Sequence, residues 1–127
     1  MTQMSLQLVD LEEVRRRGED REPSAVLVDA ELDYCRAQRR PWEHIGARMA
    51  AKRAVFEVLR ASPVEDLPWH EVEIVRHRSG RVEVLLRGGT ERLARSRGIT
   101  ALRLSMSHTR TLAAALVVCR EDQPPGP

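Results

Sequence analysis

Among the 21 basic residues of this 127-residue sequence there is a single lysine, Lys52, and aromatic residues make up only 3% of the chain. Only two cysteines are present, Cys35 and Cys119, and neither stands in a CxxC or Cys/His spacing, so the sequence predicts reduced thiols and no zinc site. No apolar run reaches 18 residues and no secretory signal is visible, so we expect a cytoplasmic protein that does not cross a membrane. The net charge of +2 argues against a dedicated nucleic-acid binder.

The first half of the chain favours one strand followed by helices. Residues 5–11 have the composition of a strand, and the charged segment 12–22 is consistent with a helix or a solvated loop. Residues 27–36 predict a helix with Asp29 as its N-cap. The longest periodic segment is 43–61, which predicts the central helix of the domain. Four apolar residues at helical spacing should share its buried face: Ile45, Met49, Phe56 and Leu59.

The second half changes to strand periodicity. Segments 71–75 and 81–87 alternate in polarity around an SG turn, which predicts a β-hairpin. Thr90 is placed to cap a short helix over 91–96. Two further segments have strand character: 102–107 and 112–119. The second of these is apolar on both faces, which predicts a central strand. We therefore expect one α+β domain over residues 1–120, with an antiparallel sheet packed on one long helix, and a disordered tail over 121–127.

Four local patterns, in order and covering nearly the whole chain, carry a resemblance to a known family. They are SLQLVDLEEV, LDYCRAQRRPWEHIGARMAAKRAVFEVL, PWHEVEIVRHRSGRVEVLL and LRLSMSHTRTLAAALVV. Together they resemble the holo-acyl carrier protein synthases, the small trimeric branch of the 4'-phosphopantetheinyl transferases. The resemblance implies a homotrimer with active sites shared between protomers. It also implies a reaction that moves phosphopantetheine from coenzyme A to a serine of an acyl carrier protein, assisted by Mg²⁺.

Three positions depart from the pattern that the resemblance implies. The aspartate of the family's first strand falls at Gln7, the metal-binding glutamate at Arg53, and a second lysine at Glu57. The glycine-containing loop after the central helix is replaced by residues 61–64. An arginine repels a divalent cation, so we expect no Mg²⁺ at this position. Arg53 and Glu57 are four residues apart and are expected to form an ion pair with each other.

Four positions match residues that the family pattern retains: Arg48, Lys52, Ser107 and His108. Arg48 and Lys52 lie one helical turn apart, so they could face one phosphate of coenzyme A or phosphopantetheine; the alternative is that they lie on a solvated face. His108 could donate to a phosphate or exchange a proton, or be a structural histidine bonded across its turn. We therefore assign cofactor binding to Arg48, Lys52, Arg53 and Ser107, and acid–base catalysis to His108 and Glu57.

Three functions are compatible with these residues. The first is a synthase-like protein that has lost Mg²⁺-dependent transfer and acts on, or binds, an acyl carrier protein or its acyl chain in a fatty acid or polyketide-type pathway. The second is metal-free transfer, with Arg53 on the pyrophosphate and Glu57 as the base. The third is a non-catalytic trimeric module that binds the acidic carrier protein. The basic residues Arg36, Arg39 and Arg40 would form the docking surface, although they equally suit a helix C-terminus.

Overall fold

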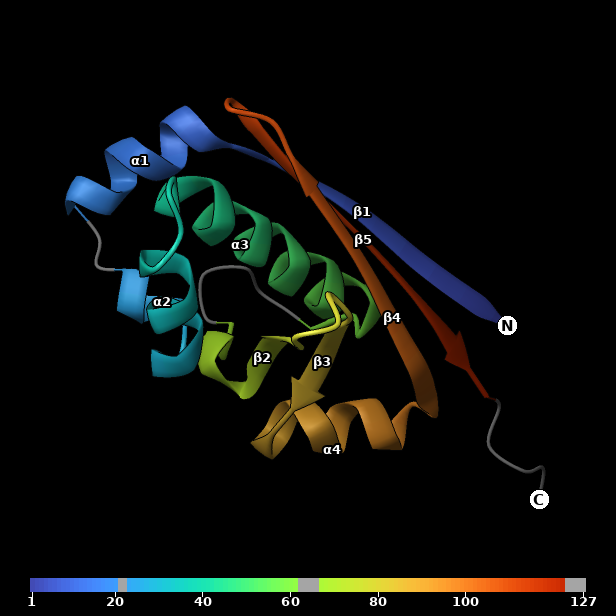
Figure 1. Cartoon of the computed structure of the whole chain (residues 1–127). Coiled ribbons are helices and arrows are strands. Elements are labelled where there is room, and N and C mark those ends of the chain that lie inside the picture. Colours follow the sequence, from blue (N-terminus) through green and yellow to red (C-terminus); the bar gives the residue numbers. More distant parts are fainter. Residues whose placement is uncertain (21–22, 62–66, 123–127) are drawn as a thin grey trace, which may run out of the picture.

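The computed structural model describes residues 1–20, 23–61 and 67–122. A three-stranded antiparallel sheet has the order β1 (Thr2–Asp10), β5 (Leu112–Glu121), β4 (Ile99–His108). The long helix α3 (Pro41–Val58) packs on one face of this sheet (Figure 1). The predicted α+β architecture is confirmed, and β5 is the central strand as its apolar sequence indicates.

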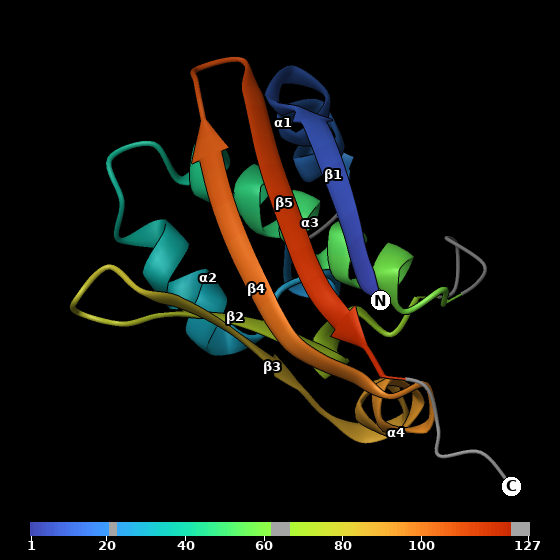
Figure 2. The same ribbon diagram turned by 90° about the vertical axis from the view of Figure 1, so that its right-hand side faces the viewer.

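The other elements surround α3 and the lower end of β4. Helices α1 (Leu11–Asp20) and α2 (Asp29–Arg36) lie on the side of α3 away from the sheet (Figure 1). The predicted hairpin forms from β2 (Val72–Arg76) and β3 (Val82–Leu86), and it leads into α4 (Gly88–Ser96) beneath β4 (Figure 2). Short 3-10 turns at Pro23–Ala25 and Trp69–Glu71 complete the element order.

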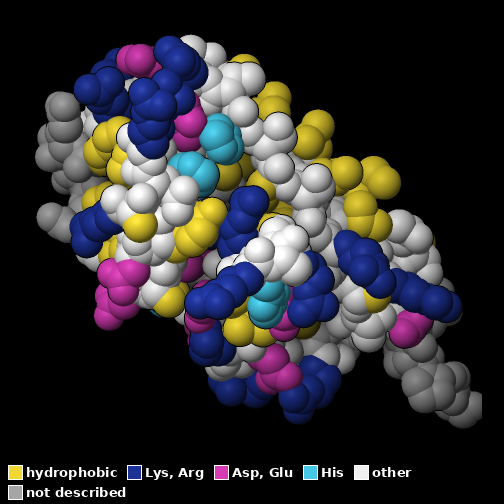
Figure 3. All heavy atoms as spheres, viewed as in Figure 1, with side chains coloured by type: hydrophobic (Ala, Val, Ile, Leu, Met, Phe, Trp, Pro, Cys, Tyr) yellow, Lys and Arg dark blue, Asp and Glu magenta, His cyan; other side chains and the backbone are white. Residues whose placement is uncertain are grey.

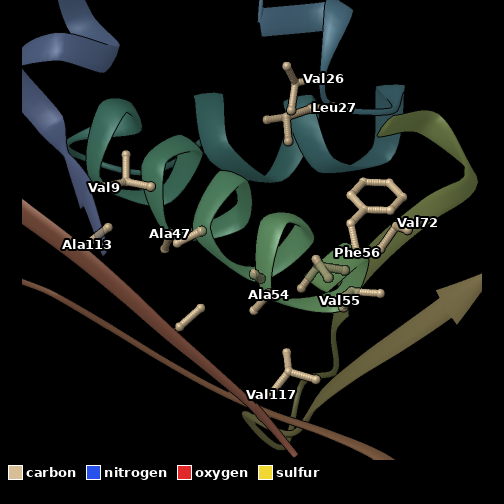
Figure 4. Packing of buried hydrophobic residues seen from close by; sticks show 14 of the residues in the cluster. Val9, Val26, Leu27, Ala47, Ala54, Val55, Phe56, Val72, Ala113 and Val117 are labelled. Atoms are coloured by element: carbon tan, nitrogen blue, oxygen red, sulfur yellow. The ribbon is translucent and has the colours of Figure 1, made fainter. Parts of the chain in front are cut away.

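Small side chains let α3 approach the sheet closely. Ala113, Ala115 and Val117 of β5 point toward the helix and are buried. On the facing side of α3, a Cβ at Gly46 would overlap Cδ2 of Leu11, so a larger residue there requires the Leu11 side chain to move. Figure 4 shows Ala47 and Ala54 of α3 turned toward Ala113 and Val117. This close contact holds the helix against the sheet and fixes which residues of α3 reach its two flanks.

The opposite face of the sheet is apolar and exposed. Because side chains alternate along a strand, Met4, Leu6 and Leu8 of β1 point away from α3 and are 65%, 62% and 61% exposed. Their cross-strand partners on β5 are Val118, Leu116 and Ala114. Figure 3 shows hydrophobic side chains in a row along this edge of the molecule, over β1.

Helix α3 is more completely buried than its periodicity predicts. Twelve of its 18 residues are buried, because α2 and β2 cover the side that the sheet leaves open. The helix also ends at Val58 rather than Ala61. Arg60 takes a left-handed conformation with φ 53°, and the amides of Arg60 and Ala61 donate back to the carbonyls of Glu57 and Phe56. This is a Schellman ending with arginine where glycine is usual.

Two predicted helix caps are wrong. Asp29 is the first residue of α2, and its N-cap is Val28, whose amide donates to Glu31 Oε1. Thr90 lies inside α4, which begins two residues earlier. The carboxylate of Glu71 caps α4 from outside, accepting hydrogen bonds from Gly89 N, Thr90 N and Thr90 Oγ1. Both caps involve a glutamate that propensity does not favour for this role.

The chain ends differ from the expected boundary at residue 120. Glu121 is the last residue of β5, and its amide donates to Met1 O. The rest of the expected tail, residues 123–127, lies outside the described residues, as do residues 62–64 of the loop after α3. No helix in the described part of the chain is long and apolar enough to span a membrane.

Candidate functional site

A cavity of about 360 Å³ opens where the end of β1 meets α1 and one flank of α3. Its walls are mostly apolar, and its charged residues are Asp10, Glu13 and Arg53. The apolar lining residues are Leu8, Val9, Val14, Pro23, Val26, Trp42, Ile45, Met49, Trp69 and Leu112. Both tryptophans of the chain are among them. The volume lies within the range of small-molecule sites.

The first strand also contains an aspartate that the sequence analysis did not consider, in addition to the predicted position Gln7. Asp10 is the last residue of β1, and its Oδ1 accepts hydrogen bonds from the amides of Glu12 and Glu13 in the first turn of α1, at 2.9 and 3.4 Å. Gln7 is not among the residues that line the cavity. The strand therefore keeps a carboxylate at the cavity. A search for the acid nearest the end of the strand, rather than at its centre, would have found Asp10.

Arg53 and Glu57, both in the described part of α3, do not form the expected ion pair. Instead, Gln7 Nε2 donates to Glu57 Oε2 at 2.5 Å and to Ser5 Oγ at 3.0 Å. Gln7 lies on β1, beside α3, and its side-chain amide binds one oxygen of the Glu57 carboxylate. The guanidinium of Arg53 lines the cavity, and no described residue makes a hydrogen bond or ion pair with it.

Lys52 lies in the protein interior rather than at a ligand site. Its ammonium donates to Glu31 Oε1 at 2.7 Å, to Val26 O at 2.7 Å and to Trp69 O at 3.1 Å, and its side chain is fully buried. The anion that it faces is therefore Glu31. All three of its protons are used, which leaves none for a bound phosphate. Burial lowers the pKa of Lys52, and the adjacent Glu31 carboxylate opposes that shift.

Arg48 shares this flank of α3 and is 2% exposed, so the alternative of a solvated face is wrong for both cations. Its guanidinium carbon lies 4.3 Å from the ring centroid of Tyr34, a cation–π contact. Its Nε has no hydrogen-bond partner among the described residues. Arg48 lines a second, smaller cavity of about 170 Å³ between α2, α3 and β2, together with Tyr34 and Arg76.

His108 lies at the end of β4 against the start of α3. Its Nδ1 is 3.2 Å from Glu43 Oε2, and its ring centroid is 5.0 Å from that of His44. The partner of His108 is therefore in α3. The alternative of a histidine bonded across its own turn is wrong. Burial lowers the pKa of His44, and His108 and Arg48 lower it further. Ser107 is exposed and, because neighbours alternate, faces the apolar side of the sheet.

The residues assigned to catalysis do not meet within one chain. Glu43, which contacts His108, and Glu57 are 14 positions apart, which corresponds to about 21 Å along α3. Arg53 and Glu57 lie on the cavity flank of the helix, whereas Arg48 and Lys52 lie under α2. The six predicted residues therefore divide into three locations: the cavity flank, the α2 flank and the end of β4.

Comparison with known proteins supports one family over nearly the full length of the chain. No protein-family model matches the chain. A holo-[acyl-carrier-protein] synthase of Desulforudis audaxviator is 40% identical over 116 residues, which cover 87% of this chain and 88% of that protein. The Moorella thermoacetica protein of the same name is 35% identical over 115 residues, covering 87% and 89% of the two chains.

Solved structures show the same fold. A complex of the Chronobacterium ammoniagenes synthase with coenzyme A superposes with a TM-score of 0.84 at 24% identity, covering 97% of this chain and 99% of that one. The Neisseria meningitidis holo-[acyl-carrier-protein] synthase gives 0.81 at 20% identity, covering 93% and 97%. With relatives at 35% and 40% identity, the chain belongs to the holo-acyl carrier protein synthase family of 4'-phosphopantetheinyl transferases.

Proposed function

We propose that the protein transfers phosphopantetheine from coenzyme A to a serine of an acyl carrier protein. The observation that carries the proposal is the full-length similarity to proteins named holo-[acyl-carrier-protein] synthase, at up to 40% identity in the comparisons above. The fold agrees with that of a synthase solved with coenzyme A. Among the functions compatible with the sequence, this activity corresponds to metal-free transfer.

The family implies Mg²⁺, and the residues at the cavity do not fit it. No group of three His, Cys, Asp or Glu side chains in the described residues is arranged to hold a metal ion. The cavity instead combines Asp10 and Glu13 with the guanidinium of Arg53, whose fixed positive charge repels a divalent cation. Asp10 also uses one oxygen to cap α1. We therefore derive no step through a metal ion.

Arg53 is placed to supply the positive charge that the reaction needs. The carrier serine Oγ attacks the phosphorus next to pantetheine, the bond to the bridging oxygen breaks, and adenosine 3',5'-bisphosphate leaves. Arg53 would bind the pyrophosphate oxygens in a bidentate manner, which neutralises charge that builds up on the leaving group. Glu57 lies one helical turn further on, is exposed, and would accept the serine proton. The chemistry then proceeds with two side chains of one helix face.

The exposed apolar face of the sheet supports assembly into a homotrimer. Met4, Leu6, Leu8 and Leu112 are each at least 47% exposed on neighbouring strands, and a face of this kind is covered in most proteins. Ser107 lies at the margin of the same face. Because His108 and Glu57 lie at opposite ends of α3, both can serve one site only where two protomers meet. Assembly would then bring the assigned acid and base together.

Carrier-protein binding without transfer is a second candidate function. It is favoured by Lys52, whose ammonium is fully used inside the protein, and by Arg53 at the position that the resemblance gives to a metal-binding carboxylate. In that case the protein would bind a carrier protein or its acyl chain, in a fatty acid or polyketide-type pathway, in the cytoplasm. In either function, the exposed residues Arg36, Arg39 and Arg40 would form the surface on which the acidic carrier protein docks.

Intact-protein mass spectrometry of an apo-carrier protein with coenzyme A separates these functions. We expect a mass gain of one phosphopantetheine that persists in EDTA, and a loss of at least 100-fold in rate for Arg53→Gln, in line with removing a group that stabilises transition-state charge. Arg78→Gln, in the exposed hairpin turn, is the matched control and should transfer normally. Transfer that stops in EDTA contradicts the metal-free chemistry.

A complete absence of transfer leaves the second function, which a binding experiment then tests. Reversing charge at Arg36, Arg39 and Arg40 should abolish carrier binding measured by titration calorimetry, and the affinity of the unmodified protein should fall as salt rises. An Arg78→Glu variant should bind normally. If neither transfer nor carrier binding is detected, both functions are wrong.

A further inference from the structure

The cavity between β1, α1 and α3 contains one charged group, Arg53, for which the described part of the chain offers no partner. The carboxylate of Asp10 accepts two hydrogen bonds from backbone amides of α1, and Glu13 also makes an interaction of its own. Arg53, in contrast, makes no hydrogen bond or ion pair with any described residue. A half-buried guanidinium next to an apolar cavity gains most from an anion, because the surrounding side chains reduce its contact with water.

The rest of the cavity selects an apolar molecule. Trp42, Met49 and Val26 line it from α3 and from the segment before α2, and Trp69 closes it from the 3-10 turn before β2. The Trp69 ring is held edge-on against Phe56, with ring centroids 5.6 Å apart, so this wall is packed rather than loose. Few polar groups are available to satisfy the amides of a pantetheine arm. A hydrocarbon chain fits these walls at lower desolvation cost.

We propose that this cavity binds a fatty carboxylate, with its carboxylate on Arg53 and its chain against Trp42, Met49 and Trp69. This ligand class goes beyond the proposed transfer. Because the same guanidinium is assigned to the pyrophosphate, a bound fatty acid competes with coenzyme A at Arg53. The protein would then be inhibited by the free acids that an acyl-chain pathway releases on thioester hydrolysis.

Tryptophan fluorescence gives a direct binding assay, since both tryptophans of the chain line the cavity. We expect octanoate to change the emission saturably, while acetate, which lacks the chain, and octanol, which lacks the charge, bind at least tenfold more weakly. Arg53→Gln should weaken octanoate binding at least tenfold and leave octanol binding unchanged. Arg78→Gln, remote from the cavity, should bind octanoate like the unmodified protein.

A second variant fills the cavity without touching the charge. Met49→Phe should weaken octanoate and octanol equally, and circular dichroism melts establish that each variant is folded. Octanoate affinity that is unchanged within twofold in both variants overturns the proposal, as does no emission change up to millimolar octanoate. The measurement uses no coenzyme A and no carrier protein, so its failure is separate from failure of the proposed transfer.

Discussion

The replacement of Lys52 by methionine tests whether the single lysine serves the fold or a phosphate. Methionine keeps the unbranched apolar stem and removes the ammonium, which donates to Glu31, Val26 O and Trp69 O. Glu31 would stay buried, with its side chain 1% exposed, and of its donors in the described residues it would keep the backbone amides of Val28 and Ile74. The variant therefore leaves one uncompensated charge in the core.

The expected loss of stability follows from that burial. Removing one partner of a buried ion pair costs about 3 to 5 kcal/mol, a large part of the about 5 to 15 kcal/mol available to a domain. With a urea m-value of about 2 kcal/mol per molar, the unfolding midpoint should fall by about 2 M. Urea titrations followed by far-ultraviolet circular dichroism at one fixed protein concentration measure this shift, since an oligomer's stability depends on concentration.

A double variant gives the matched control. Adding Glu31→Gln to Lys52→Met removes the orphaned charge and should recover more than half of the loss, so the two changes are strongly non-additive. If Lys52→Met unfolds within about 0.5 kcal/mol of the unmodified protein, the pair is not a structural element. If that variant also loses coenzyme A binding, Lys52 contacts phosphate after all and the structural account is refuted.

Three further predictions concern the ends of elements and the thiols. Glu71→Gln should destabilise the protein by about 1 kcal/mol at pH 7, as expected for losing a cap. Hydrogen bonds from Thr90 lower the pKa of Glu71 below 4.5, so the stability from this cap is present above pH 4.5 and is lost as pH falls through the folded pKa. The Glu71→Gln variant should therefore lose less melting temperature between pH 7 and acid than the unmodified protein. Arg60→Gly and Arg60→Ala both remove the ion pair with Glu121, but only glycine relieves the left-handed backbone, so the glycine variant should be more stable than the alanine variant by about 1 kcal/mol in urea titrations. Burial raises the pKa of Cys35 to about 11, so at pH 8 the folded protein should react with Ellman's reagent far more slowly than the protein in urea.

Each of these predictions can be contradicted by a single comparison. Equal acid sensitivity of Glu71→Gln and the unmodified protein would show that the cap carries no pH dependence. Equal stability of the two Arg60 variants would show that residue 60 is unstrained. Fast reaction of the folded protein with Ellman's reagent would show that the core around Cys35 opens readily.

The elements could be predicted because their signals are local. The alternation of polar and apolar residues over 81–87 and the apolar run in 112–119 each lie within a single strand. The turn at Gly80 needs only the positive φ that glycine allows. The caps of α2 and α4 were predicted wrongly because Glu31 and Glu71 act from positions that propensity scales do not weigh. Glu71 lies 18 residues before the amide of Gly89 that it caps, so no local window contains the pair.

The candidate site was predicted less completely, for the same reason. Family resemblance identified Arg53 on the central helix, and the structure places it in a cavity. Asp10 lines the same cavity, and its position at the junction of β1 and α1 becomes apparent only when α1 is packed beside α3. The expected pairing of Arg53 with Glu57 rests on helix geometry alone. In the structure, Glu57 instead accepts a hydrogen bond from Gln7, which lies 50 positions earlier in the chain and is brought beside α3 by the sheet.

The sequence by itself determined the order of helices and strands, the single α+β domain and the family, because period, turn residues and motif order are properties of neighbouring residues. Only the tertiary structure decided what Lys52 does. Its one charge lies between α2, α3 and the turn before β2, 21 positions from Glu31, and burial leaves it no partner except those that folding brings to it. The same folding leaves Arg53, the next residue along the helix and about 100° further around it, facing an apolar cavity.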